Sequence, residues 1–121
     1  MPIEAEDAIR RIWIAYAQRS SVPSRRVTFS DGSEPEANRC EQNVAQWTLE
    51  HPEYRKVHGW LAIGDPPQLQ KHWMVQDEKG QLLNITPLNP LFPMFAHPGA
   101  LAEFSELLEI INLVHFQHLR G

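Results

Sequence analysis

Apolar positions recur at helical spacing in two outer stretches of the chain. Over residues 4–19, EAEDAIRRIWIAYAQR, apolar side chains follow one another at intervals of three and four, and acidic residues fill the first turn. This pattern predicts an amphipathic helix whose apolar stripe packs against a core. Residues 100–114 carry the same spacing and predict a second amphipathic helix. Its apolar stripe consists of Leu101, Phe104, Leu108 and Ile111.

A third helical segment, NRCEQNVAQWTLEH, covers residues 38–51, and its start is open to two interpretations. Asn38 and Ser33 are each followed three residues later by a glutamate, as in a capping box. A start at Asn38, which we favour, puts Cys40 in the first turn beside unpaired backbone N–H groups. A start at Ser33 puts Cys40 two turns into the helix. The helix ends before Pro52, because a residue that precedes proline is driven out of the α region.

The remaining pattern is that of strands and turns. YRKVHGWLAIG, residues 54–64, predicts one strand, and KHWMVQDEKGQLLNITP, residues 71–87, predicts two more around a turn at residues 77–80. An earlier VTF at residues 27–29 predicts a short strand or an extended segment. Residues 87–99 contain four prolines and no periodicity, so we expect irregular structure there.

The order of these elements predicts the α+β class. Helices at both ends and in the middle, with strands grouped between them, are typical of a small antiparallel sheet packed against helices. We expect three to four strands in one domain over residues 1–121. A chain of 121 residues can bury a sufficient core without disulfides or a bound metal.

The net charge indicates which kinds of partner the protein binds, and the cysteine content indicates its cellular compartment. The formal net charge of −4 argues against nucleic acid or an anionic membrane as the main partner, because both attract basic surfaces. A single cysteine cannot form an internal disulfide. The N-terminal residues lack the basic and apolar regions of a signal peptide, and no apolar run approaches the ~20 residues of a membrane helix. We therefore expect a cytoplasmic protein.

Three residues have the types needed for thiol chemistry: Cys40, His72 and Asn84. A thiol attacks a carbonyl carbon only as thiolate, and a free cysteine with a pKa of ~8.5 is mostly protonated at neutral pH. A histidine that takes the proton, and a third group that orients the imidazole, make the attack feasible. The third group is a carboxylate or an amide oxygen, and Asn84 provides the latter.

The turn at residues 77–80 decides whether His72 and Asn84 meet. A three-residue loop with Gly80 in the left-handed region pairs Asp77 with Gln81, so that His72 and Asn84 are diagonal neighbours on one face. A two-residue loop instead sends Asn84 to the opposite face. Gly80 favours the three-residue loop.

The segments RCEQNV, HGWLAI and KHWMVQDEKGQLLNITP together resemble the minimal pattern of papain-like and transglutaminase-like cysteine domains. They are also similar to small uncharacterised bacterial proteins, some of them associated with SEC-C zinc-binding motifs. Those proteins carry Cys-x-x-Asn-Val, Gly-Trp, His-x-Trp or His-x-Val, and Asp-x-Thr-Pro. The resemblance covers residues 38–87, and Asn84 stands where aspartate is commoner.

This resemblance implies a compact papain- or transglutaminase-like fold with Cys40 as nucleophile, His72 as general base and acid, and Asn84 as orienting residue. The implied activity is that of a cysteine-dependent hydrolase or acyl-transfer enzyme acting on a peptide bond or a glutamine side chain. We consider three side chains as candidates for substrate binding. They are Trp60, Trp73 and Asn43.

Plainer interpretations stay open beside the catalytic one. Cys40 shares a helical stripe with Val44 and Trp47, so it is also a candidate for a small core residue. The chain is also compatible with a non-catalytic protein-binding or accessory module of the same fold. His115 and His118 have a spacing that a metal can use, but no second cysteine or His-Glu-x-x-His motif accompanies them. We expect no metal and no cofactor.

Overall fold

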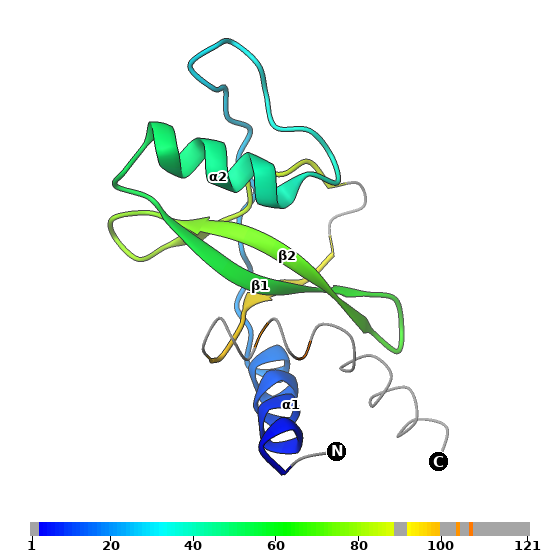
Figure 1. Cartoon of the computed structure of the whole chain (residues 1–121). Coiled ribbons are helices and arrows are strands. Elements are labelled where there is room, and N and C mark those ends of the chain that lie inside the picture. Colours follow the sequence, from blue (N-terminus) through cyan, green and yellow to red (C-terminus); the bar gives the residue numbers. More distant parts are fainter. Residues whose placement is uncertain (1–2, 89–91, 100–103, 105–106, 108–121) are drawn as a thin grey trace.

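The computed structural model describes residues 3–88, 92–99, 104 and 107. Within these residues the chain forms two helices and four strands, which confirms the predicted α+β class (Figure 1). The predicted helix over residues 100–114 lies outside the described part, apart from Phe104 and Leu107, which are helical and buried. The elements are α1 (Ile3–Ala17), α2 (Cys40–Glu50), β1 (Arg55–Ile63), β2 (Gln68–Gln76), β3 (Leu82–Leu83) and β4 (Met94–Ala96).

The four strands form one antiparallel sheet in the order β3-β2-β1-β4. β1 and β2 pair along their full length, from Arg55 opposite Gln76 to Ile63 opposite Gln68. β3 is much shorter, and it pairs with β2 only at Val75 and Gln76. One edge of β2 is therefore largely uncovered by β3.

β4 corrects the expectation that the proline-rich stretch is irregular. Its three residues contain no proline, and Pro93 and Pro98 flank them. Pro93 bonds to β1 only through its carbonyl oxygen, which accepts from the N–H of Ala62 at 2.9 Å. Proline lacks an N–H, so it is tolerated at the end of a strand where only its acceptor is used.

The start of α2 agrees with the preferred prediction in one respect and differs in another. Cys40 is the first helical residue, so the thiol belongs to the first turn. Arg39, and not Asn38, occupies the capping position, and no side chain caps the helix. Asn38 instead adopts a positive φ of 65°, a conformation that asparagine tolerates better than most residues. The prediction of Asn38 as the cap was wrong.

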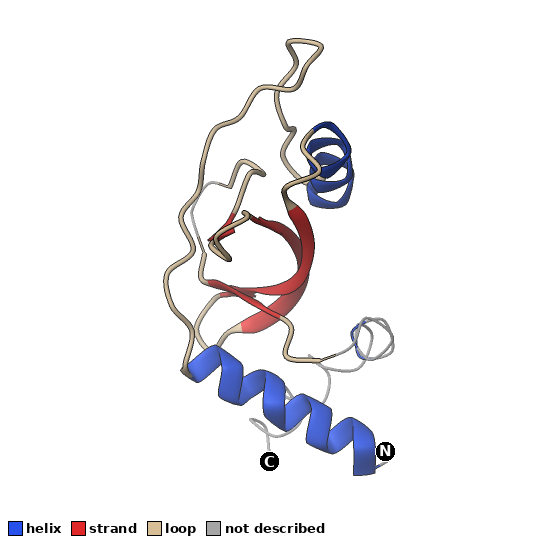
Figure 2. Cartoon of the chain, turned by 90° about the vertical axis from the view of Figure 1, so that its left-hand side faces the viewer, coloured by secondary structure: helices blue, strands red, loops and turns tan. Residues whose placement is uncertain are grey.

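Both helices lie on the same face of the β1–β2 hairpin, which we call the helix face. It carries Trp60, Leu69, Trp73 and Val75. α1 packs its buried side chains against Trp60 and Leu69, while Val44 and Trp47 of α2 pack against Val75. Figure 2 shows α2 on the outer, convex side of the curled strands.

The opposite face, which we call the loop face, carries Leu61, His72 and Met74. Long connecting segments cover it instead of a helix, and Figure 2 shows them on the inner side of the curl. Val22, Leu88 and Phe92 from these segments pack against an apolar cluster that contains Leu61 and Met74. The loop face thus combines apolar packing with a buried histidine.

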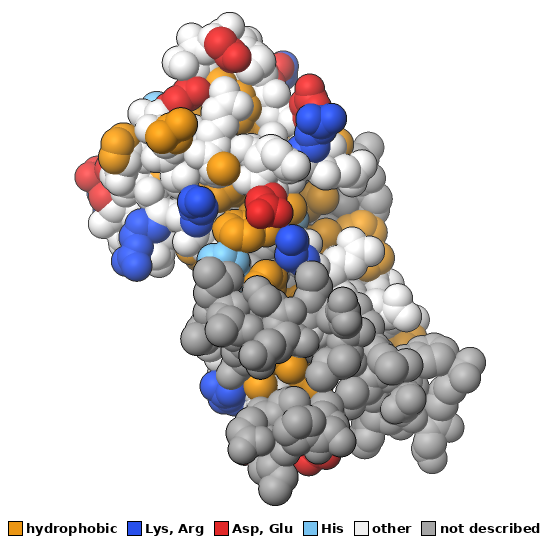
Figure 3. All heavy atoms as spheres, in the orientation of Figure 1, with side chains coloured by type: hydrophobic (Ala, Val, Ile, Leu, Met, Phe, Trp, Pro, Cys, Tyr) orange, Lys and Arg blue, Asp and Glu red, His pale blue; other side chains and the backbone are white. Residues whose placement is uncertain are grey.

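The described surface carries charges of both signs. On the side seen in Figure 3, basic and acidic side chains are interspersed, without a large patch of one sign. None of the helices within the described residues combines the length and the apolar composition that a membrane crossing requires.

Candidate active site

The turn between β2 and β3 has the geometry that the sequence predicted. Asp77 donates its N–H to the carbonyl oxygen of Gln81 at 3.0 Å, and Gly80 has a positive φ of 86°. The Asp77 carboxylate also accepts from the backbone N–H groups of Lys79 and Gln81 at 2.9 Å. Glycine takes the left-handed conformation without a Cβ penalty, so the three-residue loop and its register are confirmed.

His72 and Asn84 meet on the loop face as this register requires. His72 Nε2 lies 2.9 Å from Asn84 Oδ1, and both side chains are buried, with 3% and 1% of their surface exposed. Asn84 adds two bonds to the backbone of Thr86: Oδ1 accepts from its N–H at 3.2 Å, and Nδ2 donates to its carbonyl oxygen at 2.9 Å. Nδ2 also donates to Ser24 Oγ at 3.1 Å.

These backbone bonds determine which imidazole nitrogen carries the proton. A backbone N–H only donates and a backbone carbonyl only accepts, so Thr86 fixes which end of the Asn84 amide is oxygen. The oxygen faces His72, and an amide oxygen accepts only. His72 Nε2 must therefore donate, which leaves Nδ1 of the neutral ring with its lone pair.

Burial keeps the imidazole neutral. Loss of hydration lowers the pKa of His72 below its ordinary value, and the hydrogen bond to Asn84 opposes this shift to a smaller extent. A neutral imidazole can accept a proton, whereas an imidazolium cannot. In this state His72 has the protonation required of a general base.

Asn43 joins the helix α2 to this pair of residues. Its Nδ2 lies 3.0 Å from Thr86 Oγ1 and 2.8 Å from the carbonyl oxygen of Glu36. A continuous network therefore runs from His72 through Asn84 and Thr86 to Asn43, one turn after Cys40. Asn43 is buried and occupied by these partners, so it acts as a structural link and does not offer its amide to a substrate.

Cys40 begins α2, which packs on the face of β2 opposite to the His72 side chain. α2 packs on the helix face, and Glu41 lies 3.4 Å from Lys71, the neighbour of His72 whose side chain points to that face. The thiol is partly exposed, and within the described residues no hydrogen bond joins it to His72. The structure thus brings His72 and Asn84 together, and among the described residues it shows no contact that joins Cys40 to either of them.

Two of the candidate substrate-binding residues have other roles in the structure. Trp60 has no exposed surface, and its Nε1 donates to His97 Nδ1 at 3.0 Å, so in this structure it belongs to the core. A tryptophan at the centre of β1 is enclosed by the helix that covers this face. Trp73 is partly buried, with its ring centroid 4.1 Å from that of His58.

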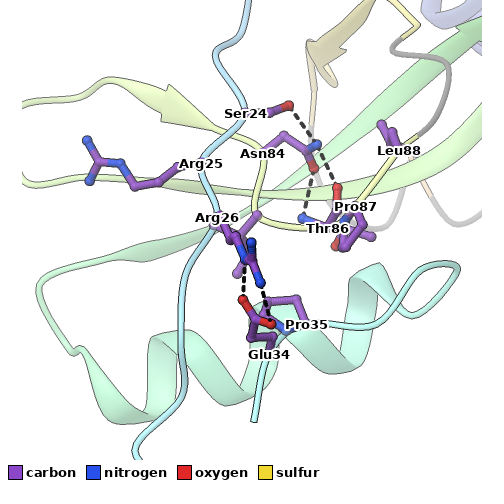
Figure 4. Close-up of a pocket in the computed structure, with 10 residues that line it drawn as sticks. Ser24, Arg25, Arg26, Glu34, Pro35, Asn84, Thr86, Pro87 and Leu88 are labelled. Atoms are coloured by element: carbon purple, nitrogen blue, oxygen red, sulfur yellow. Dashed lines mark hydrogen bonds and ion pairs between the residues drawn. The ribbon is translucent and has the colours of Figure 1, made fainter. Parts of the chain in front are cut away.

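A cavity of about 520 Å³ lies beside the polar network. Its walls come from residues 24–26, 34–35 and 84–88 (Figure 4). Pro35, Ile85 and Leu88 contribute apolar surface, and Asn84 separates the cavity from His72. An ion pair between Arg26 and Glu34 connects two of the segments that form the walls.

Ser24 and Thr86 hold Asn84 in place, although neither was among the predicted site residues. Thr86 belongs to the Asn-x-Thr-Pro motif, and an asparagine side chain often bonds to the backbone two residues on. That local tendency was a usable signal for Thr86. Ser24 lies 60 residues from Asn84 and has no comparable signal.

Two further sources of evidence about this site are metal-ligand clusters and similarity to known proteins. Across the part of the chain that the structure describes, no three His, Cys, Asp or Glu side chains gather as metal ligands. His115 and His118 fall outside that part. No protein-family model, no curated protein and no solved structure matches the chain.

Proposed function

We propose that the protein is a cysteine-dependent hydrolase or acyl-transfer enzyme of compact papain- or transglutaminase-like fold. Cys40 is the nucleophile, His72 the general base and acid, and Asn84 the residue that orients the imidazole. One observation supports this proposal above the others. The Asn84 amide, held by the Thr86 backbone, fixes the His72 tautomer so that Nδ1 is the proton acceptor.

The reaction follows from these roles. His72 Nδ1 takes the proton from the Cys40 thiol, and the thiolate sulfur bonds to the carbonyl carbon of a peptide or glutamine amide. The C–N bond then breaks, and the imidazolium returns the proton to the departing amine, which leaves a thioester. Water or a second amine attacks the thioester, loses a proton to His72 and releases the thiol.

Labelling of Cys40 tests the base assignment. The chain has one cysteine, so a glutamine-containing peptide vinyl sulfone can report only on Cys40. We expect labelling near neutral pH, and we expect His72→Gln to slow it by about 10²-fold, the lower range for general base catalysis. The rate is measured by mass spectrometry of the intact protein.

His51→Gln is the matched control, because His51 also follows Cys40 on the chain but lies at the far end of α2. It should label at the wild-type rate. Circular dichroism spectra of both variants establish that they are folded. Equal labelling rates for His72→Gln and His51→Gln would remove the base assignment.

A second candidate function is a non-catalytic protein-binding module, and the cavity beside Asn84 favours it. The apolar walls of this cavity include Ile85 and Leu88 and do not include Cys40 or His72. Under this alternative, Cys40→Ser retains a bound protein partner, whereas Leu88→Asp releases it by placing a charge in the cavity wall. Partner retention in a pull-down compares the two variants, and loss of the partner from Cys40→Ser would contradict this candidate.

A further inference from the structure

Within the described residues, the backbone of β2 presents unused hydrogen-bonding groups on one side at Lys71 and Trp73. Ala62 donates to Pro93 and His97 donates to His58, so the even-numbered residues of β1 direct their backbone groups to β4. Backbone groups alternate in direction along a strand, so the odd-numbered residues of β1 bond to β2. Their partners in β2 are the even-numbered residues, as in the pair Gly59 and His72.

The N–H and C=O groups of Lys71 and Trp73 consequently point away from β1. β3 pairs only as far as Val75, and beyond Leu83 the chain bonds to another segment. Asn84 donates to the carbonyl oxygen of Pro23 and accepts from the N–H of Arg25, both at 2.9 Å. Among the described residues, none forms a backbone hydrogen bond with Lys71 or Trp73 on this open side.

We infer that this open edge of β2 binds an extended peptide segment as an added strand. Only a second extended backbone offers donors and acceptors at the alternating spacing of such an edge. The Lys71 side chain is 35% exposed and is already paired with Glu41, so its charge is balanced. Recognition through backbone groups accepts many peptide sequences.

The edge lies near the proposed catalytic residues. A catalytic role for peptide binding at this edge rests on the proposed function. The first turn of α2 lies on the helix face beside Lys71, and His72 projects from the loop face. A peptide along the edge passes between these two sides. Under the proposed function, the thiol and the imidazole must reach one another directly beside this edge, because His72 takes the proton from Cys40.

Binding is tested in the Cys40→Ser protein, so that no reaction interferes. The probe is the capped peptide Ac-Thr-Val-Thr-Gln-Thr-Val-Thr-NH2, whose residues favour extended structure. We expect saturable binding with a Kd of about 1 mM or tighter, followed by the amide shifts of Lys71 and Trp73 in NMR spectra. Methylating the two central amide nitrogens of the peptide should weaken binding by about tenfold, and methylating only the first one should not.

Lys71→Pro and Lys71→Ala are the matched variants on the protein side. Proline removes the outward N–H of residue 71, which forms no bond to β1, while alanine removes the side chain and keeps the N–H. We expect Lys71→Pro to bind the peptide about tenfold more weakly and Lys71→Ala to bind it as the parent does. Gln70→Pro, which removes an N–H bonded to β1, should unfold the hairpin instead.

Three results would overturn the inference: no binding of the peptide, equal binding of its centrally methylated form, or equal binding by the two Lys71 variants. Hydrogen exchange in the free protein adds a test without ligand. If the Lys71 and Trp73 amides exchange as slowly as that of Met74, which bonds to β1, the edge is already occupied and the inference fails. Peptide binding without turnover by the wild type supports the inference and contradicts only the proposed function.

Discussion

The two faces of the β1–β2 hairpin are stabilised by different chemistry, although the same two strands supply both. The helix face is apolar, with Trp60, Leu69 and Val75 buried beneath α1 and α2. The loop face holds His72, Asn84 and Thr86 in a hydrogen-bonded network, with Leu61 and Met74 as its apolar neighbours.

The two faces therefore contribute differently to the stability of the fold and to the chemistry of the candidate site. Apolar packing is not directional and tolerates substitutions that keep shape and volume, whereas a buried polar group needs its particular partner. The network also fixes the tautomer of His72, which apolar packing could not do. We therefore expect the helix face to determine most of the free energy of unfolding, and the loop face to determine the protonation state of the candidate base.

The largest expected effect is on the helix face. Trp60→Ala should lower the free energy of unfolding by about 3–5 kcal/mol, because it leaves a cavity under α1. Urea denaturation measures the change. Trp60→Phe keeps an aromatic ring, loses the bond to His97 and should be milder. A stability of Trp60→Ala equal to that of the wild type would show that this face is not the main core.

A double-mutant cycle probes the loop face. Asn84→Leu should cost about 2–3 kcal/mol, because it leaves the Thr86 backbone and His72 Nε2 without their partner. His72→Leu should cost about 1–2 kcal/mol, and the double variant should be more stable than the sum by about 1 kcal/mol. Urea denaturation of the four proteins gives this coupling. Strict additivity would mean that the His72–Asn84 bond contributes nothing to stability.

The smallest effect is in the pH dependence of stability, and it compares a histidine from each face. Burial lowers the pKa of His72, and burial followed by the charge of Lys56 lowers that of His58. Below pH ~6.5 the unfolded chain therefore binds more protons than the folded one, and stability falls as the pH falls. Above that pH this contribution is fully present.

We expect the Tm of the wild type to decrease from pH 7 to pH 5. The slope of Tm against pH should be shallower in His72→Gln than in the wild type, and His58→Gln should reduce this slope by a smaller amount. His72 is 3% exposed and His58 is only partly buried, which gives the two variants their order. Differential scanning calorimetry at several pH values measures both slopes. The opposite order would place the stronger burial effect on the helix face.

Local signals in the sequence were sufficient for much of the site. The apolar spacing indicated α1, capping-type residues and Pro52 indicated α2, and Gly80 in the turn after Asp77 specified the register of β2 and β3. That register alone placed His72 and Asn84 on one face, because side chains alternate strictly along a strand. Thr86 was within reach of the same reasoning, since its bonds to Asn84 span only two residues.

Other features depend on contacts between distant segments. The strand β4, the burial of Trp60, the bond from Asn43 to Thr86 and the bond from Asn84 to Ser24 all join parts of the chain that periodicity treats separately. The proline content of residues 87–99 suggested irregular structure, but Met94–Ala96 form a strand because they pair with β1. The sequence by itself thus determined the helices, the strand register and the types of the site residues, because these follow from neighbours along the chain. Tertiary structure alone decided which face each helix covers and how far β3 pairs along β2, because these depend on contacts between segments that are distant in the sequence.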